Sequence, residues 1–160
     1  MVNITIEYVI MIPLLFSTVI VFPLVANRIT TETQEAQLRI ELQDVADHMA
    51  STIQQLYLSV NSEEILTGTV TQESPVPVTV AFYPYTVEGS LYDPGDGSAK
   101  VFTAFLTLDD VGNTVTASAV LGTNVQWVDS SFRSTSVDAS IMVQKLDDAD
   151  HTIVFSFGGS

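Results

Sequence analysis

Hydrophobic residues form one uninterrupted block near the start of the chain. Nineteen consecutive residues, from Tyr8 to Ala26, carry no charged side chain. A helix rises about 1.5 Å per residue, so a helix of this length spans the roughly 30 Å of a bilayer core. The block is apolar on every face and requires lipid or other helices around it. It predicts either a permanent membrane anchor or a helix that first lies in a membrane and later packs among copies of itself.

The residues before and within this apolar block refine the prediction. A cleavable secretory signal is disfavoured, because residues 1–7 contain one acid and no Lys or Arg. Pro13 and Pro23 each lack a backbone N–H and crowd the carbonyl four residues earlier, so both are expected kink positions. The kinks are either tolerated bends or points where the helix can melt. The hydroxyls of Ser17 and Thr18 lie one turn after Pro13 and can bond back to the Pro13 and Leu14 carbonyls.

The helical pattern continues beyond the apolar block, over residues 27–60, with no Gly or Pro. Apolar residues recur at spacings of three and four, which is the pattern of one buried helix stripe. The stripe consists of Leu38, Leu42, Val45, Met49, Ile53, Leu56 and Val60. Residues 1–60 are therefore predicted to be one long helix, apolar over 1–26 and amphipathic over 27–60.

The remaining residues, 61–160, have the pattern of short strands. Val, Thr, Phe and Tyr alternate with a period of two, and turn signals separate the runs at 93–98, 109–113 and 147–151. The expected strands cover residues 76–83, 86–92, 100–108, 114–121, 140–145 and 152–157. The fold class predicted is α+β, with a long hydrophobic-then-amphipathic helix followed by an antiparallel β-sandwich.

Charge and composition exclude several classes of function. The chain has 19 acidic and 5 basic residues, a net charge of −14, and no cysteine. Nucleic-acid phosphates would repel such a chain, and disulfides and thiolate metal sites cannot form. Residues 61–160 contribute 3 basic and 13 acidic residues, a net −10, so most of the negative charge belongs to the β-domain.

Candidate catalytic chemistry is sparse. Asp44, Asp47 and His48 are neighbours on one helix, but they lack a further ligand and are expected to form a solvated face. The acidic run at 93–98 is expected to be a turn rather than a calcium loop, because it lacks the ligand pattern of an EF-hand. The acidic cluster at 147–150 fits weak binding of a hard cation and a solvated loop equally well. No nucleophile, nucleotide or zinc motif occurs in the sequence. We expect no enzymatic activity, no catalytic residue, no metal and no cofactor.

Glu7 stands at the start of the apolar block, where burial of an unpaired charge is costly. For an isolated anchor, attraction to the positive N-terminal end of the helix dipole is a sufficient explanation. If copies of the helix bundle together, Glu7 needs a cation, and the chain has none before Arg28. The α-amino group of a neighbouring chain would satisfy it and would fix the axial register between subunits.

This arrangement resembles archaeal type IV pilin-like proteins with a class III signal peptide. The resemblance rests on the start Asn3-Ile4-Thr5-Ile6-Glu7-Tyr8, the apolar block, the continuing helix and the β-rich remainder. It implies a major pilin, the structural subunit of an extracellular filament that serves surface adhesion. It implies a homopolymer with helices in the core and β-domains outside, inserted in the cytoplasmic membrane before an assembly ATPase and a platform protein extract it.

The residues expected to pack in the filament core are Tyr8, Ile10, Leu14, Phe16, Ile20 and Phe22. Two other functions fit the same pattern. One is a single-pass membrane protein that displays the β-domain as a binding or sensor module. The other is a minor pilin or an archaellum component.

Overall fold

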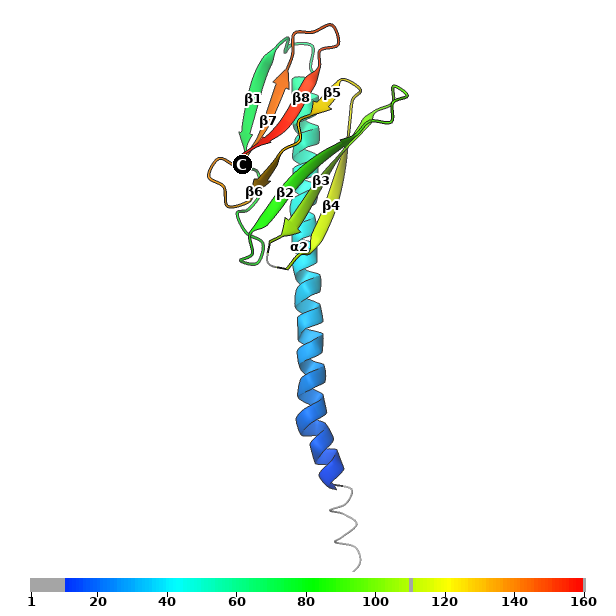
Figure 1. Ribbon diagram of the computed structural model, residues 1–160, viewed down its shortest axis with the longest axis vertical. Helices are drawn as coiled ribbons and strands as arrows, with labels where there is room; N and C mark the ends of the chain where they lie inside the picture. Colours follow the sequence, from blue (N-terminus) through cyan, green and yellow to red (C-terminus); the bar gives the residue numbers. More distant parts are fainter. Residues whose placement is uncertain (1–10, 110, 160) are drawn as a thin grey trace, which may run out of the picture. The chain divides into compact units, whose positions relative to one another are not determined.

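The computed structural model describes residues 11–109 and 111–159. The chain divides into two compact units, Met1–Leu38 and Arg39–Ser160. One helix, Met11–Val60, contributes to both units. The first unit contains the apolar part of this helix, and the second contains its last turns together with all the strands (Figure 1).

Within residues 11–109 and 111–159, eight strands form two four-stranded sheets. The first sheet has the order β1-β7-β8-β5, and the second has the order β4-β3-β2-β6. Every pairing is antiparallel except that of β5 with β8, which is parallel. The strand bounds are β1 (Gly68–Glu73), β2 (Tyr85–Tyr92), β3 (Lys100–Leu108), β4 (Thr114–Leu121), β5 (Val125–Trp127), β6 (Ser131–Arg133), β7 (Ser140–Lys145) and β8 (Ile153–Gly158). A long helix followed by two mainly antiparallel sheets confirms the predicted α+β class.

Strict alternation along the strands determines which side chains face the core. Strand β4 buries every second residue, and β3 buries Phe102, Ala104, Leu106 and Leu108. The period of two puts these side chains on one face of the second sheet. Side chains from both sheets and from the end of the helix join in one hydrophobic core. Trp127 is partly buried against this core and lies 4.7 Å from Phe102 between ring centroids, within the range of a stabilising aromatic pair.

The last turns of helix α2 (Phe22–Val60) supply the helical part of this core. Six residues spaced by three or four are buried: Leu42, Ala46, Met49, Ile53, Tyr57 and Val60. The predicted stripe is confirmed at four of these positions. The buried face is rotated slightly from the predicted stripe. The small residue Ala46 and the amphipathic residue Tyr57 are buried, while Val45 and Leu56 of the predicted stripe are only partly buried.

The predicted strand over residues 76–83 is wrong. Here Val80 and Tyr83 exchange two backbone hydrogen bonds of 2.9 Å around a two-residue turn. The turn residues, Ala81 and Phe82, have φ values of 45° and 75°. Pro75, Pro77 and Pro84 flank the turn and cannot donate to a strand ladder, which explains why the alternating residues do not join a sheet.

Lys145, at the end of β7, caps the C-terminal end of α2. Its side chain is buried, and its Nζ donates to the Val60 and Ser62 carbonyls, each at 3.0 Å. The last carbonyls of a helix have no partner within the helix and carry partial negative charge, so a cation is favourable there. A second contact lies beside it, where the Tyr57 hydroxyl donates to Asn124 Oδ1 at 3.2 Å. These bonds join the end of the helix to the sheets.

Candidate assembly surface

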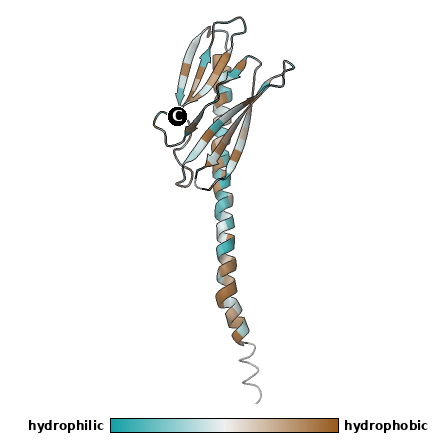
Figure 2. Cartoon of the chain, in the orientation of Figure 1, coloured by the Kyte–Doolittle hydropathy of each residue, from teal (hydrophilic) through white to brown (hydrophobic). Residues whose placement is uncertain are grey.

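The apolar part of the helix is exposed on all sides within its own unit. The large hydrophobic side chains between Met11 and Val25 are 43–72% exposed. They include four of the predicted core-packing residues: Leu14, Phe16, Ile20 and Phe22. Figure 2 shows the hydrophobic turns at the beginning of the described helix and the polar turns that follow them. The helix therefore presents an apolar surface that requires a cover.

One side of this surface forms a shallow apolar groove. Five side chains line it: Ile12, Leu15, Phe16, Val19 and Ile20. Their spacing of i, i+3, i+4, i+7 and i+8 is that of a helix face that receives the side chains of another helix. Ile12, Leu15 and Val19 were not among the predicted packing residues, because the block is apolar on every face and its sequence favours no one of them. An apolar groove of this kind binds hydrocarbon, from either a lipid or a second helix.

A π-helical turn, η1 (Ser17–Val21), separates the two prolines. The Phe22 N–H bonds to the Ser17 carbonyl, five residues earlier rather than four. The wider turn ends at Val21, two residues before Pro23, whose ring would otherwise crowd the carbonyl of the preceding turn. The Thr18 hydroxyl donates to the Leu14 carbonyl at 3.1 Å, as predicted from its place after Pro13. The sequence predicted disturbed helix geometry near the prolines but not its π-helical form.

Polar residues cover the helix after the apolar block. Arg28 and Glu32 form an exposed ion pair of 3.4 Å at i,i+4 spacing, worth about 0.3–0.5 kcal/mol. Thr30, Thr31 and Thr33 donate to carbonyls four residues earlier, which satisfies their hydroxyls within the helix. This part of the first unit is suited to water, in contrast to the residues before it.

The structure leaves part of the predicted site untested. Glu7, Tyr8 and Ile10 lie outside the described residues. The described candidates Leu14, Phe16, Ile20 and Phe22 lie on the same exposed helix, together with Pro13 and Pro23. By length and composition this helix can cross a membrane: its apolar window has a mean hydropathy of 1.8, with no residue of that window buried. The absence of burial within the window distinguishes it from the core helix of a soluble protein.

The acidic loops use their carboxylates to hold their own turns. Asp93 accepts from the Gly95 N–H and Asp96 from the Ser98 N–H, each at 2.9 Å. Hydrogen bonding to Lys100 lowers the pKa of Asp93, and hydrogen bonding to Ser98 lowers that of Asp96. A carboxylate that accepts such bonds is stabilised in its charged form.

The remaining acidic candidates also have hydrogen-bond partners within the protein or lie exposed on the helix. Asp148 accepts from the Thr152 N–H at 2.8 Å, and hydrogen bonding to Thr152 lowers the pKa of Asp148. Asp44, Asp47 and His48 are exposed on the helix, where Asp47 accepts from the Gln43 amide at 3.0 Å. Over residues 11–109 and 111–159, no three His, Asp or Glu side chains are grouped so that they could hold a metal ion. The acidic turns thus have structural partners of their own.

Comparison with known proteins does not identify the chain. No model of a protein family, no curated protein and no solved structure matches it.

Proposed function

We propose that the chain is the major pilin of an extracellular type IV-like filament. In this proposal the apolar helices of many copies bundle in the core, and the β-domains form the outer wall and serve surface adhesion. The observation that carries it is the apolar helical surface from Met11 to Val25, which is exposed on all sides within its unit. Helices of identical copies offer such a surface a matching cover.

The energetic argument favours a polymer in water. Covering a helix of this length removes on the order of 1,500–2,000 Å² of apolar surface from water, worth tens of kcal/mol before ordering costs at about 25 cal/mol per Å². In a membrane the gain is smaller, because lipid tails are as apolar as neighbouring helices. Moving the helix from membrane to filament therefore requires external work. An assembly ATPase and a platform protein would supply it.

Glu7 would set the register of the polymer. In a bundle its carboxylate would lose water, and an α-amino group of a neighbouring subunit would neutralise it. Only one axial stagger brings these two charges together. The charge distribution supports the outward placement of the β-domain, since residues 61–160 carry a net −10. Like-charged outer walls keep filaments dispersed.

A single-pass membrane protein is the second candidate. The length and composition of the helix Met11–Val60 favour it as much as they favour a pilin precursor. In that case the apolar surface is covered by lipid throughout the life of the protein, and the β-domain acts alone as a binding or sensor module. A minor pilin or an archaellum component would differ from the major pilin in abundance within the filament.

Replacement of Glu7 separates these candidates. We expect Glu7→Ala to abolish filaments in sheared cell-surface material while the chain still enters the membrane fraction. Glu35→Ala is the matched control, because Glu35 is an exposed carboxylate on the polar part of the same helix. Negative-stain electron microscopy and mass spectrometry of the sheared material measure both outcomes. A wild-type chain that stays in the membrane and is monomeric in detergent would establish the single-pass candidate instead.

A further inference from the structure

A polar groove lies beside β5, where the two sheets of the β-domain come together. It consists of two adjoining hollows of about 370 and 330 Å³, which share Lys100, Val125 and Gln126. Strand β5 is the last strand of its sheet, while Lys100 begins β3 of the other sheet. We call the two hollows together the edge groove. Each has the volume of a small-ligand pocket, and the three shared residues belong to strands, which position side chains more precisely than loops do.

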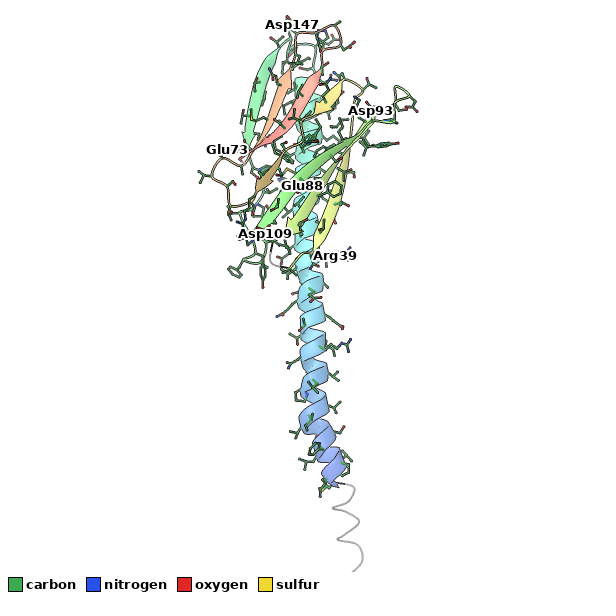
Figure 3. All side chains as sticks on the ribbon, viewed as in Figure 1. Arg39, Glu73, Glu88, Asp93, Asp109 and Asp147 are labelled. Carbon is green, nitrogen blue, oxygen red and sulfur yellow. The ribbon has the colours of Figure 1, made fainter. Side chains whose placement is uncertain are left out.

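Lys100 lines both hollows and is held in place by two partners. Its Nζ is 2.8 Å from Asp93 Oδ2 and donates to the Val125 carbonyl at 3.0 Å. Figure 3 shows Asp93 at the end of β2, close to β5, as these two bonds require. An ammonium has three N–H donors, so the two bonds leave one donor for a ligand. The bond to Val125 also occupies a carbonyl of β5, which opposes the pairing of an added peptide strand with this edge.

The edge groove offers hydrogen-bond donors and acceptors together. The larger hollow contains the carboxylates of Asp93 and Asp129, and the smaller one contains that of Asp150. The hydroxyl and amide side chains of the groove are Ser90, Thr123, Asn124, Gln126 and Thr152. Gln126 is exposed at the middle of β5, and its amide can both donate and accept. A ligand hydroxyl also does both, so it can bond to every kind of polar group present here.

Trp127 gives the larger hollow an apolar wall, together with Leu91 and Val125. Its ring packs against Phe102 and Phe157, with ring centroids 4.7 and 4.8 Å away, so its position is fixed. The indole Nε1 is buried and has no hydrogen-bond partner among the described residues. Almost all buried polar groups in native proteins are paired. The partner of this N–H therefore comes from outside the chain, as water or as a ligand.

Charge restricts the class of ligand. The three carboxylates of the edge groove outnumber its one ammonium, and residues 61–160 carry 13 acidic and 3 basic residues, so anions are repelled. A metal ion is also disfavoured, because Asp93 already pairs with Lys100 and accepts from the Gly95 N–H. In the described part of the chain no three acidic or His side chains could hold one together. A neutral molecule with several hydroxyls and an apolar C–H face matches the polar groups and the wall of the groove.

We propose that the edge groove binds a neutral saccharide. The hydroxyls of the sugar bond to Lys100, Gln126 and Asp129, and its C–H groups lie against the wall formed by Trp127 and Leu91. This inference goes beyond the proposed function, because the groove belongs to the β-domain and serves a pilin and a single-pass binding module alike. Within a filament it identifies the class of molecule to which the pilus adheres, and only this link to adhesion rests on the proposed function.

Titration of the full chain with oligosaccharides tests the proposal. The chain is kept in a polyoxyethylene detergent, which carries no sugar headgroup. The neutral probes are maltohexaose, cellohexaose, mannohexaose and hexa-N-acetylchitohexaose, and the charged probes are hexagalacturonate and hexalysine. Fluorescence of Trp127, the only tryptophan, reports binding in the larger hollow, and saturation-transfer NMR detects binding that leaves the fluorescence unchanged. We expect at least one neutral hexasaccharide to bind saturably, and at least about tenfold more tightly than hexagalacturonate.

Gln126→Ala locates the site. The side chain is exposed, so the fold should tolerate its loss, and the urea midpoint of the variant checks this. We expect the affinity for the bound saccharide to fall about threefold to tenfold, because the variant removes an amide that both donates and accepts. Gln144→Ala is the matched control, since Gln144 is an exposed glutamine on β7 of the same sheet and does not line the groove.

Several results would overturn this inference. One is the failure of every neutral hexasaccharide to bind, and another is the same affinity in Gln126→Ala as in Gln144→Ala. Tighter binding of hexagalacturonate or hexalysine than of any neutral probe would assign the edge groove to a charged ligand instead. None of these results concerns filament assembly, which the Glu7→Ala experiment tests, so the two proposals fail separately.

Discussion

Replacing Lys145 with Met tests how the β-domain holds the end of the long helix. The substitution keeps an unbranched apolar stem of similar length, so packing changes little, but it removes the donor to the Val60 and Ser62 carbonyls. A hydrogen bond from a charged group contributes about 1.5–3 kcal/mol, and the cost of burying the ammonium offsets part of the two bonds. We expect Lys145→Met to lower the free energy of unfolding by about 2–4 kcal/mol.

Urea titration of the full chain in a non-ionic detergent measures this loss. Trp127 is the only tryptophan and lies in the aromatic cluster of the β-domain, so its fluorescence reports unfolding of that unit. With a urea dependence of about 2 kcal/mol per M, the expected loss shifts the midpoint downward by roughly 1–2 M. Hydrogen exchange gives a local measure, since the Asn61 N–H, which bonds to the Tyr57 carbonyl, should exchange faster when the last turn loosens.

Arg133→Met is the control for loss of a positive charge. Arg133 pairs with Asp109 at 2.7 Å, but its side chain is 58% exposed, and exposed pairs contribute less than about 1 kcal/mol. A Lys145→Met midpoint shift no larger than that of Arg133→Met would refute the role of Lys145 as the helix cap.

Three further predictions concern the β-domain. Gly122→Ala should destabilise it by about 1–3 kcal/mol, because the new Cβ would collide with the Tyr57 hydroxyl; Tyr57→Phe in the same chain should recover part of the loss in the urea titration. Tyr85→Phe should cost about 1 kcal/mol in that titration by removing the bond to the preceding loop, and an unchanged midpoint would contradict it. The Asp148 carboxylate has a lowered pKa, so its contribution is complete above the ordinary carboxyl pKa of about 4 and is lost as the pH falls through the lowered value. The Thr152 amide shift in NMR should therefore stay constant from pH 7 to about 4 and move only below that; movement near pH 6 would contradict the assignment.

The regular parts of the fold could be predicted because their sequence patterns are local. Strands β3 and β4 alternate without interruption, and their predicted bounds, 100–108 and 114–121, match the structure. Burial on one face alone maintains such alternation over eight or nine residues. The acidic run at 93–98 was predicted as a turn for a similar reason, since Asp and Gly occupy the positions that its turns require.

The errors occur where distant contacts decide the structure. Strands β5 and β6 have three residues each, which is too short for a period to be recognised, and only pairing with other strands defines them. The error over 76–83 has a local cause instead, because the prolines there and the tight turn at Phe82 prevent the strand that the alternation predicted. Lys145 reaches the end of a helix 85 positions earlier in the chain, so no local pattern could reveal its role.

Part of the candidate surface was readable and part was not. The sequence shows which residues must be shielded from water, because no charged residue interrupts the apolar block from Tyr8 to Ala26. The apolar groove lined by Ile12, Leu15 and Val19 required the helix geometry, since on a helix apolar all round the sequence alone favours no face. Strand register alone shows that Tyr92, Val101 and Val120, which are distant in the sequence, lie in one row across β2, β3 and β4.

The π-helical turn at Ser17–Val21 changes the directions in which side chains before and after it point around the helix axis. One extra residue in a turn offsets everything before it by about 100° of rotation relative to an unbroken α-helix. A helical wheel that assumes an unbroken α-helix over residues 11–38 would therefore place the side chains before Ser17 on the wrong face of the helix. Deleting one residue between Ser17 and Val21 would rotate the first turns by about a quarter of a revolution while preserving their hydrophobicity. Such a deletion separates the effect of hydrophobicity from that of the orientation of the helix face. A helix surrounded by lipid would tolerate the deletion, whereas a neighbouring helix packed against one particular face would not.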